Sequence, residues 1–381
     1  MRDPQLNQRS SPQNSPRSST RRRLQLSAGI IAAACAVASL PAAAQNNKQV
    51  VMQDPGGAYG DALRKYIYDP FTKESGIKVS PVMEGRSGPR IKKQVEAGRT
   101  EWDMAYIYEQ ETRQLADCCL TPIDYKKLSP EAQKTVASMP KEAVTPTGIA
   151  VEVIGVAMAY STKKYKTEAE RPKNWADFWD VKKFPGKRCL PTFPRFVFEA
   201  ALMADGVPKD KLYPIDVDRA LKKIAEIKPH VTKWWLTTAQ PPQLLLDGEA
   251  TMCMAYAARI NDLILNEPDA GLAMTWNQGF TYYNYLSIPK NSPNPEATLK
   301  LLSYRLTPQN AARFANFYGV PLPSPLVYEA GDPKIRAHWS TNPENEKVAV
   351  QWNATYWGSP APDGRTNEEY LQEKLNTLLA K

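Results

Sequence analysis

Polar and aromatic side chains that could bind a small molecule follow three short apolar runs of this sequence. The first run ends at residues 54–59, a turn of the type Asp-Pro-Gly-Gly that leads to Tyr59. Arg86 and Ser87 follow the second run, and Glu109 follows the third. Ligands of open α/β sheets lie beyond the carboxyl ends of the strands. We therefore expect these three segments to border one cleft.

Covalent and metal chemistry have little support in the sequence. It has only two histidines, His230 and His338, in distant segments, and it lacks the HExxH, GxSxG and GxGxxG motifs. The two glycines of residues 56–57 indicate a plain turn rather than a phosphate cradle. The cysteines lack metal-ligand spacing. We predict that the protein is not an enzyme and has neither a cofactor nor a metal site.

The elements that would position the first segment lie in residues 49–79. An apolar run at residues 50–52 predicts a strand, and a second strand resumes at residues 77–79. Between them, apolar residues recur at helical spacing at Leu63, Tyr66, Ile67 and Phe71. Pro70 should bend this helix, and Gly76 should end it. The segment is predicted to be a βαβ unit.

Later elements follow from the same patterns. Residues 80–88 are predicted to be a loop, and residues 103–107 and 250–257 to be strands. Residues 151–160 are rich in β-formers and predict a first crossover strand between two lobes, and residues 286–289 end a second one. The predicted helices are 89–97, 198–204, 217–227, 241–246, 296–306 and 368–380.

The first 44 residues are predicted to be an export signal that is removed. Three arginines at residues 21–23 precede an apolar run at residues 24–40, and three alanines at residues 42–44 offer a cleavage site. The arginine group also resembles a twin-arginine signal. No later segment has the apolar length of a membrane span.

Charge argues against a nucleic-acid partner. The first 44 residues hold six arginines and one aspartate, so the formal charge of +9 falls to about +4 for the rest of the chain. The remaining lysine pairs are scattered, as expected of a solvated surface.

The 337 residues after the signal exceed what one core usually supports, so two lobes are expected. Of the four cysteines in this part, Cys253 lies between two methionines and is interpreted mainly as a buried core thiol. A disulfide between Cys189 and Cys253 is an open alternative, because sequence cannot establish connectivity.

Five segments in order carry a family resemblance: GGAYGDALRKYIYDPF at 56–71, NWADFWDVKKFPGKRCLP at 174–191, ADGVPKDKLYPIDVDRALKKI at 204–224, WWLTTAQPPQLLLDGEATMCMAY at 234–256 and YLSIPKNSPNPEATLKLL at 285–302. The chain resembles the exported solute-binding proteins of bacterial ABC importers, in the spermidine/putrescine-binding group. The resemblance implies a periplasmic, monomeric protein that captures a small organic solute and delivers it to an inner-membrane permease with its ATPase.

The fold implied by the resemblance is α/β, a two-lobed periplasmic-binding-protein fold of type II with the ligand cleft between lobes joined by crossover strands. Residues 45–152 and 284–325 would form lobe I, and residues 153–283 and 326–381 would form lobe II.

The resemblance also implies part of the binding site. Tyr256 and Tyr282 stand where family tryptophans flank the ligand. Phe193, Phe196 and Asn284 stand where acidic residues are expected. Losing about three carboxylates would leave an ammonium group uncompensated, at a cost of several kcal/mol.

Other residues favour an anionic group. Arg86 and Arg195 can bind it in bidentate fashion, and a predicted helix N-terminus near Gln240 offers backbone donors. We therefore expect a ligand that bears a carboxylate or is a zwitterion. A genuine polyamine ligand is the alternative, and a periplasmic hydrolase is a disfavoured alternative of another class. The predicted cleft residues are Tyr59, Arg86, Ser87, Glu109, Arg195, Gln240, Tyr256, Tyr282 and Asn284.

Structural interpretations of the same residues stay open. Tyr256 and Tyr282 could be core or rim tyrosines, and Arg86 a surface loop residue. Arg195 could pair with Glu199, four residues on. The helical spacing of the three aromatic residues Trp175, Phe178 and Trp179 favours core packing over ligand contact.

Overall fold

The computed structural model of the protein describes residues 48–85 and 88–381. Two sheets form within this part of the chain. The smaller sheet pairs β1 (Gln49–Asp54) in parallel with β2 (Lys78–Met83). The larger sheet contains nine strands: β3 (Ala105–Tyr108), β4 (Leu120–Thr121), β5 (Val144–Thr145), β6 (Gly148–Ser161), β7 (Arg188–Pro191), β8 (Val231–Trp235), β9 (Met252–Tyr256), β10 (Leu272–Pro289) and β11 (Val350–Gln351).

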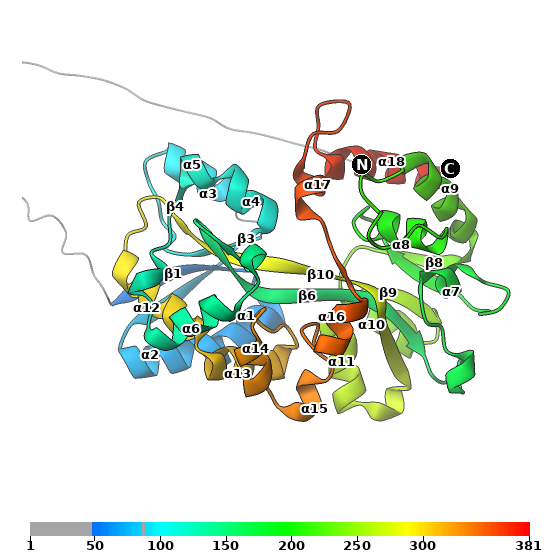
Figure 1. Cartoon of the computed structure of the whole chain (residues 1–381), viewed down its shortest axis with the longest axis horizontal. Coiled ribbons are helices and arrows are strands. Elements are labelled where there is room, and N and C mark those ends of the chain that lie inside the picture. The colour runs from blue at the N-terminus through cyan, green and yellow to red at the C-terminus, as the bar shows by residue number, and fades with distance from the viewer. Residues whose placement is uncertain (1–47, 86–87) are drawn as a thin grey trace, which may run out of the picture. The chain divides into compact units, whose positions relative to one another are not determined.

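Two long antiparallel strands, β6 and β10, are neighbours within the larger sheet. The main path of the larger sheet is β11-β10-β6-β9-β7-β8, while β3 and β4 pair with β10 and β5 pairs with β6. Strand β6 has 14 residues and β10 has 18, and the two pair from Leu272 with Ser161 to Leu286 with Ile149. Figure 1 shows both strands running between two groups of helices. These are the two predicted crossover strands.

The first βαβ unit forms as predicted, with an added detail in its helix. Helix α1 (Gly57–Leu63) continues through a π-helical turn, η1 (Arg64–Tyr68), into α2 (Asp69–Ser75), and Gly76 ends it in a left-handed conformation at φ 70°. The predicted loop at residues 80–88 is wrong at its start, because β2 extends to Met83. Pro81 is tolerated there because β2 is an edge strand of its sheet.

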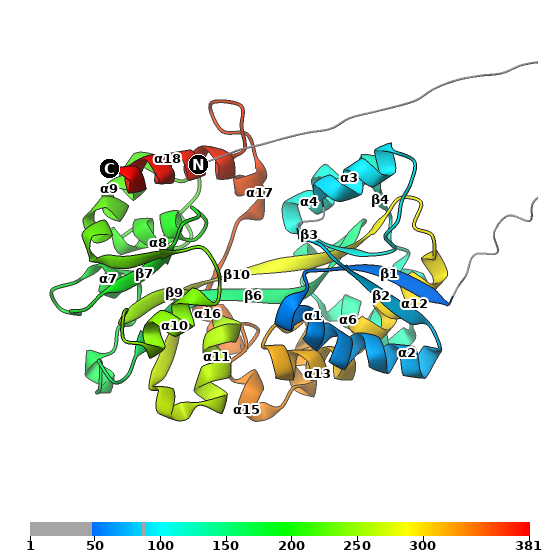
Figure 2. The ribbon, with the colours of Figure 1, turned by 180° about the vertical axis from the view of Figure 1, so that it is seen from behind.

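The remaining helices surround the two ends of the crossover strands, as the rear view in Figure 2 also shows. They are α3 (Gly88–Glu96), α4 (Glu109–Gln114), α5 (Ala116–Cys119), α6 (Pro130–Ser138), α7 (Trp175–Trp179), α8 (Val197–Ala204), α9 (Val217–Ile227), α10 (Gln240–Leu246), α11 (Ala257–Asn266), α12 (Pro295–Leu306), α13 (Pro308–Tyr318), α14 (Pro325–Ala330), α15 (Pro333–Arg336), α16 (Pro343–Val348), α17 (Ala354–Gly358) and α18 (Asn367–Ala380). Short 3₁₀ turns occur at Tyr125–Lys127, Lys141–Ala143, Glu168–Glu170, Lys228–His230 and Pro268–Ala270.

All six helices predicted after residue 88 are present, with ends shifted by at most one residue. The predicted strand at 250–257 is shorter, because Ala257 already begins α11. Helices α11 and α13 were not predicted from the sequence.

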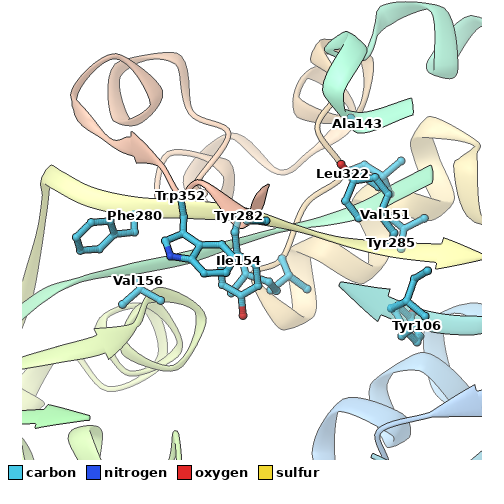
Figure 3. Close-up of a cluster of buried hydrophobic side chains, with 14 of the residues drawn as sticks. Tyr106, Ala143, Val151, Ile154, Val156, Phe280, Tyr282, Tyr285, Leu322 and Trp352 are labelled. Atoms are coloured by element: carbon cyan, nitrogen blue, oxygen red, sulfur yellow. The ribbon is translucent and has the colours of Figure 1, made fainter. Parts of the chain in front are cut away.

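Buried side chains line both faces of the crossover strands. Figure 3 shows Val151, Ile154 and Val156 of β6 beside Phe280, Tyr282 and Tyr285 of β10, with Leu322 and Trp352 packed against them. The aromatic residues of α7 are also core residues, since Trp175, Phe178 and Trp179 are 1%, 0% and 8% exposed. The core-packing interpretation of this helix is confirmed.

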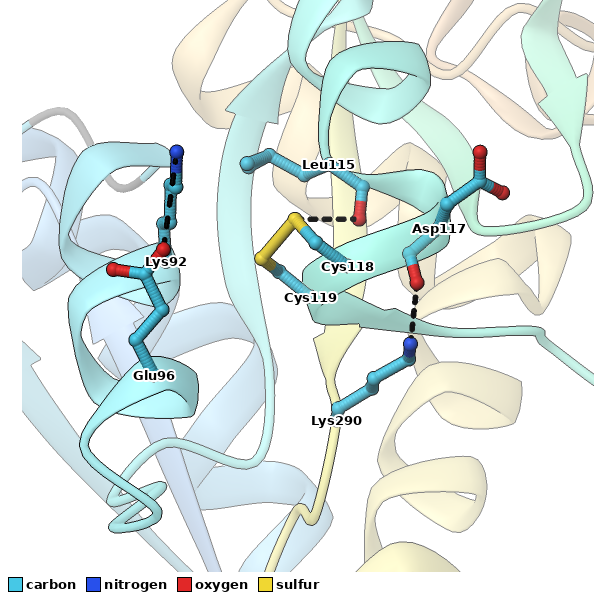
Figure 4. The surroundings of a disulfide bond; sticks show 7 residues. All are labelled: Lys92, Glu96, Leu115, Asp117, Cys118, Cys119 and Lys290. Atoms are coloured by element: carbon cyan, nitrogen blue, oxygen red, sulfur yellow. Dashed lines mark hydrogen bonds and ion pairs between the residues drawn. A yellow bond between two sulfur atoms is a disulfide. The ribbon is translucent and has the colours of Figure 1, made fainter.

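Two disulfides are present in the described part of the chain. Cys189 of β7 and Cys253 of β9 face each other in the strand register and are joined, so Cys253 is buried but is not a free thiol. Cys118 and Cys119, neighbours in α5, form a second disulfide that the sequence did not suggest. Figure 4 shows it beside Lys290, whose ammonium group donates to the carbonyl oxygen of Asp117.

Among residues 48–85 and 88–381, no helix combines the length and the apolar character that crossing a membrane requires.

Candidate ligand-binding site

A cavity of about 350 Å³ lies where the ends of β1, β3 and β9 meet the crossover strands. Its walls are largely aromatic, with six tyrosines: Tyr59, Tyr106, Tyr108, Tyr256, Tyr282 and Tyr318. Polar groups reach it from several elements, and they include Gln53, Glu152, Thr238, Arg259 and Asn284. A cavity with apolar walls and a few convergent polar groups is typical of a site for a small molecule.

Glu152 of β6 supplies a buried carboxylate to this cavity. It is 1% exposed and accepts hydrogen bonds from the hydroxyl of Tyr59 and from Asn284 Nδ2, the latter at 3.1 Å. A guanidinium nitrogen of Arg305 lies 3.7 Å from its carboxylate. Burial raises the pKa of Glu152 to about 7, whereas Arg305 and Asn284 act to lower it. A cation in the cavity would hold this acid in its ionised form.

A positive group comes from α11. Arg259 lies in the first turn of this helix, is exposed, and donates from Nε to Thr238 Oγ1 at 3.2 Å. Tyr256 is the N-cap residue of α11, and no side chain of the described residues caps the helix there. Tyr256, Ala258 and Arg259 all line the cavity. The helix dipole and the guanidinium therefore favour an anionic group at this place.

Tyr318 lies near both charged groups. Burial is the main cause that raises its pKa, and the charges of Arg259 and Glu152 act on it in opposite directions. Its ring lies 5.0 Å from that of Tyr59, edge to face. The cavity thus has an acidic group and a basic group with an aromatic wall beside both.

Residues 66–347 match the family model of the bacterial extracellular solute-binding proteins. The chain belongs to this family. The family is one of solute-binding proteins rather than of enzymes, and its members act outside the cytoplasm.

Individual relatives of this solute-binding protein agree with the family match. A gamma-aminobutyric acid-binding protein of Pseudomonas aeruginosa is 30% identical over 335 residues, which are 86% of this chain and 89% of that protein. A spermidine/putrescine-binding periplasmic protein of Escherichia coli is 21% identical over 321 residues, or 81% of this chain and 87% of that protein.

The fold has equally clear relatives among solved structures. The crystal structure of an ABC transporter from Rhodopseudomonas palustris superposes with a TM-score of 0.77 and 58% identity, covering 87% of this chain and 99% of that chain. The likeness confirms the predicted type II periplasmic-binding-protein fold, and the predicted family resemblance is also confirmed.

The structure brings four of the nine predicted site residues into the lining of the cavity. They are Tyr59, Tyr256, Tyr282 and Asn284. Tyr59 comes from the first turn of α1, Tyr256 from the end of β9, and the other two from β10. Arg86 and Ser87 lie outside the described residues.

Arg195 lies beside the cavity rather than in its lining. Its guanidinium carbon is 5.6 Å from the ring centroid of Tyr108 and 5.7 Å from that of Trp352. Burial acts to lower the pKa of Arg195, but Glu368, with which it forms an ion pair at 2.9 Å, contributes most to raising it. The alternative pairing with Glu199 is wrong, since the carboxylate of Glu199 accepts from Tyr213 and Trp357 instead.

Glu109 and Gln240 lie outside the lining of the cavity. Glu109 begins α4 and pairs with Arg113 at 3.3 Å. Gln240 begins α10, where its side-chain oxygen accepts from the backbone nitrogens of Leu236 and Thr237. Its side-chain oxygen is therefore occupied by backbone N–H groups just before the helix.

The polar and aromatic lining residues that sequence reasoning missed include Glu152, Arg259 and Tyr318. Glu152 left a signal, because an acid within a run of buried β-formers needs a partner or a function. The other two lie in α11 and α13, which were not predicted, so no position could be assigned to them.

Proposed function

We propose that this protein captures a short zwitterion, with one ammonium and one carboxylate, for an ABC importer. The ligand class is that of 4-aminobutanoate. The observation that carries the proposal is a single tyrosine-walled cavity that contains both the buried carboxylate of Glu152 and the guanidinium of Arg259.

The ammonium group would bind at Glu152. A desolvated ammonium requires a carboxylate and further acceptors, because an unpaired buried charge costs several kcal/mol. The carboxylate of Glu152 is already oriented by Tyr59 and Asn284. The tyrosine rings can cover the methylene groups of the ligand, and their faces also attract a cation.

The ligand carboxylate would bind at the start of α11. Arg259 offers a charged donor, and the backbone N–H groups of the first helical turn point in the same direction. Thr238, the hydrogen-bond partner of Arg259, can hold its side chain in place.

The two ends of the ligand would then contact different lobes. The predicted boundaries assign Glu152 to lobe I and Arg259 to lobe II. A ligand that contacts both lobes favours the closed state, which a membrane permease with its ATPase can recognise. Export to the periplasm as a monomer, by a signal within the first 44 residues, completes the proposal.

The composition of the cavity argues against a polyamine. Glu152 is the only carboxylate side chain among the described residues that line it, and Arg259 would repel a second ammonium group. Phe193 and Phe196, which replace expected acids, instead pack on Trp235 and Tyr282. The similarity to a gamma-aminobutyric acid-binding protein supports a zwitterion.

Thermal-shift measurements on the purified protein without its first 44 residues test the proposal. The matched ligands are 4-aminobutanoate, butylamine, butanoate and putrescine. A ligand at about a hundred times its dissociation constant adds roughly 2.7 kcal/mol of stability. We expect 4-aminobutanoate to give the largest shift. A large shift with putrescine and none with any zwitterion would contradict the proposal.

A further inference from the structure

Behind the cavity wall lies a buried group of charges that ligand contact alone does not explain. Asp54, Glu152 and Arg305 are 1%, 1% and 2% exposed. Tyr68 and Tyr106, 3% and 9% exposed, lie among them. We call these five residues the acid-end cluster. Only Glu152 and Tyr106 also line the cavity.

Arg305, of α12, occupies the centre of this cluster. One of its guanidinium nitrogens lies 3.7 Å from Glu152 and 3.5 Å from the carbonyl oxygen of Val151. Its guanidinium carbon stacks 4.5 Å from the ring centroid of Phe314. That ring contacts Tyr59 at 5.7 Å, so Arg305 is separated from the cavity by one layer of side chains.

Asp54 supplies the second negative charge. Its Oδ1 accepts from the backbone nitrogen of Gly56 at 2.6 Å, which fixes the side chain at the end of β1. An added Cβ on Gly60 would lie 2.5 Å from the same oxygen, so α1 closes over it. Asp54 and Arg305 both act on the pKa of Glu152, the first raising it and the second lowering it, though less than burial does.

The formal charges of this cluster sum to a single negative charge when both acids are ionised. Two carboxylates and one guanidinium together carry one net negative charge, which one ammonium group balances. Without Arg305 the same place would hold two buried negative charges whenever both acids are ionised. Buried charges are screened little by salt, so this difference in net charge between the cluster with and without Arg305 acts on any ligand that enters the cavity.

We propose that Arg305 is a specificity-determining positioning residue. By balancing Asp54, it makes the cavity select a ligand with one ammonium group over a diammonium ligand. This inference rests on the proposed function, because it takes the ammonium group to bind at Glu152. It explains how a fold shared with polyamine-binding relatives can hold a neutral zwitterion.

The central experiment measures dissociation constants of 4-aminobutanoate and putrescine by isothermal titration calorimetry. In Arg305→Met the ratio of putrescine affinity to 4-aminobutanoate affinity should rise about tenfold or more, since an extra buried negative charge favours the more cationic ligand. Arg305→Lys keeps the charge and should keep the wild-type ratio. A purely structural role would weaken both ligands and leave the ratio unchanged.

A charge-compensated variant provides the rescue. Asp54→Asn with Arg305→Met restores one net negative charge, while asparagine keeps the oxygen that Gly56 needs. Its ratio should return to within about threefold of the wild-type value. Asp54→Asn alone leaves the cluster neutral, so its ratio should fall about tenfold or more, in the opposite direction.

The outcomes separate the two proposals. If wild-type protein binds no zwitterion, the proposed function fails. If wild-type protein binds 4-aminobutanoate but the ratio is unchanged in Arg305→Met, the inference about Arg305 is overturned and the function stands. Should Arg305→Met not fold, an unchanged ratio in Asp54→Asn overturns the inference equally.

Discussion

Glu152 is the residue on which the binding chemistry depends most. It is fully buried, it accepts hydrogen bonds from two side chains, and it lies in the cavity wall. A carboxylate in such surroundings is costly unless a cation completes its set of partners. The ion pair with Arg305 supplies part of this compensation, and the proposed ligand supplies the rest.

Replacing Glu152 with glutamine should reduce affinity for 4-aminobutanoate by about thirtyfold or more, because a buried hydrogen-bonded charge pair is worth about 2 kcal/mol or more. Titration calorimetry at pH 8 measures the affinity of both proteins for 4-aminobutanoate. The matched control is Glu199→Gln, another buried acid, which accepts from Tyr213 and Trp357 away from the cavity. Equal losses of affinity in both variants would assign Glu152 a structural role only.

The pKa of Glu152 gives a stability prediction with a definite sign. Burial raises this pKa from 4.5 to about 7 in the folded protein. The stability that it contributes is therefore fully present below pH 4.5 and is lost as the pH rises through 7. The loss should be up to about 3 kcal/mol. Glu152→Gln should lack this loss.

Urea unfolding of the ligand-free wild-type and variant proteins between pH 4.5 and 8 measures the difference. The comparison removes the effect of other acids with raised pKa values, such as Glu109 and Glu199. Parallel stability curves for the two proteins would refute the prediction. Ligand affinity should change in the opposite sense and rise with pH through 7, since an ammonium group binds the ionised acid.

Residues were predictable from sequence where a local pattern fixed their place. Tyr59 follows the glycine turn of the first strand, and Asn284 lies at a position that the family resemblance identified. Glu152 was missed because a run of β-formers was interpreted only by its composition. Arg259 depended on a helix boundary, at which local propensity is weak and tertiary packing decides.

At the scale of elements, the predicted βαβ unit and the two crossover strands were found, because helical spacing and runs of β-formers are clear there. The sequence did not indicate that β9 ends at Tyr256 so that α11 begins at the cavity. Nor could it show that Asp54 and Arg305, about 250 positions apart, meet in one cluster. Proximity between residues so far apart in the sequence depends on tertiary packing.

The disulfide between Cys189 and Cys253 should stabilise the pairing of β7 with β9, the strand that ends at Tyr256. It closes a loop with a sequence separation of 64 residues. Changing both cysteines to serine should lower the free energy of unfolding by about 2–4 kcal/mol. Denaturant unfolding under non-reducing conditions measures the loss.

The control is the double serine variant at Cys118 and Cys119, whose disulfide spans a sequence separation of 1. Since this bond closes no chain loop, its removal should change stability by less than about 1 kcal/mol. A larger loss from the second pair than from the first would contradict the loop-entropy account.

For the whole molecule, the two long strands β6 and β10 run between the two groups of helices (Figure 1). Glu152 and Asn284 lie on these strands, whereas Arg259 lies on α11. A ligand held at both places links the strands to α11. A ligand with only one charged end makes half of these contacts, and so gives less differential affinity for the closed state.

Closure should therefore require both ends of the ligand. Small-angle scattering at saturating 4-aminobutanoate should show a smaller radius of gyration than the ligand-free protein, whereas saturating butylamine should not. Moving a two-state equilibrium from 1:99 to 99:1 takes about 10⁴-fold tighter binding to the closed state, which a single ion pair does not supply. In Arg259→Gln, 4-aminobutanoate should bind weakly and without compaction, while butylamine affinity stays within about threefold of the wild-type value. Equal compaction with both ligands in wild-type protein would show that the carboxylate end plays no part in closing the lobes.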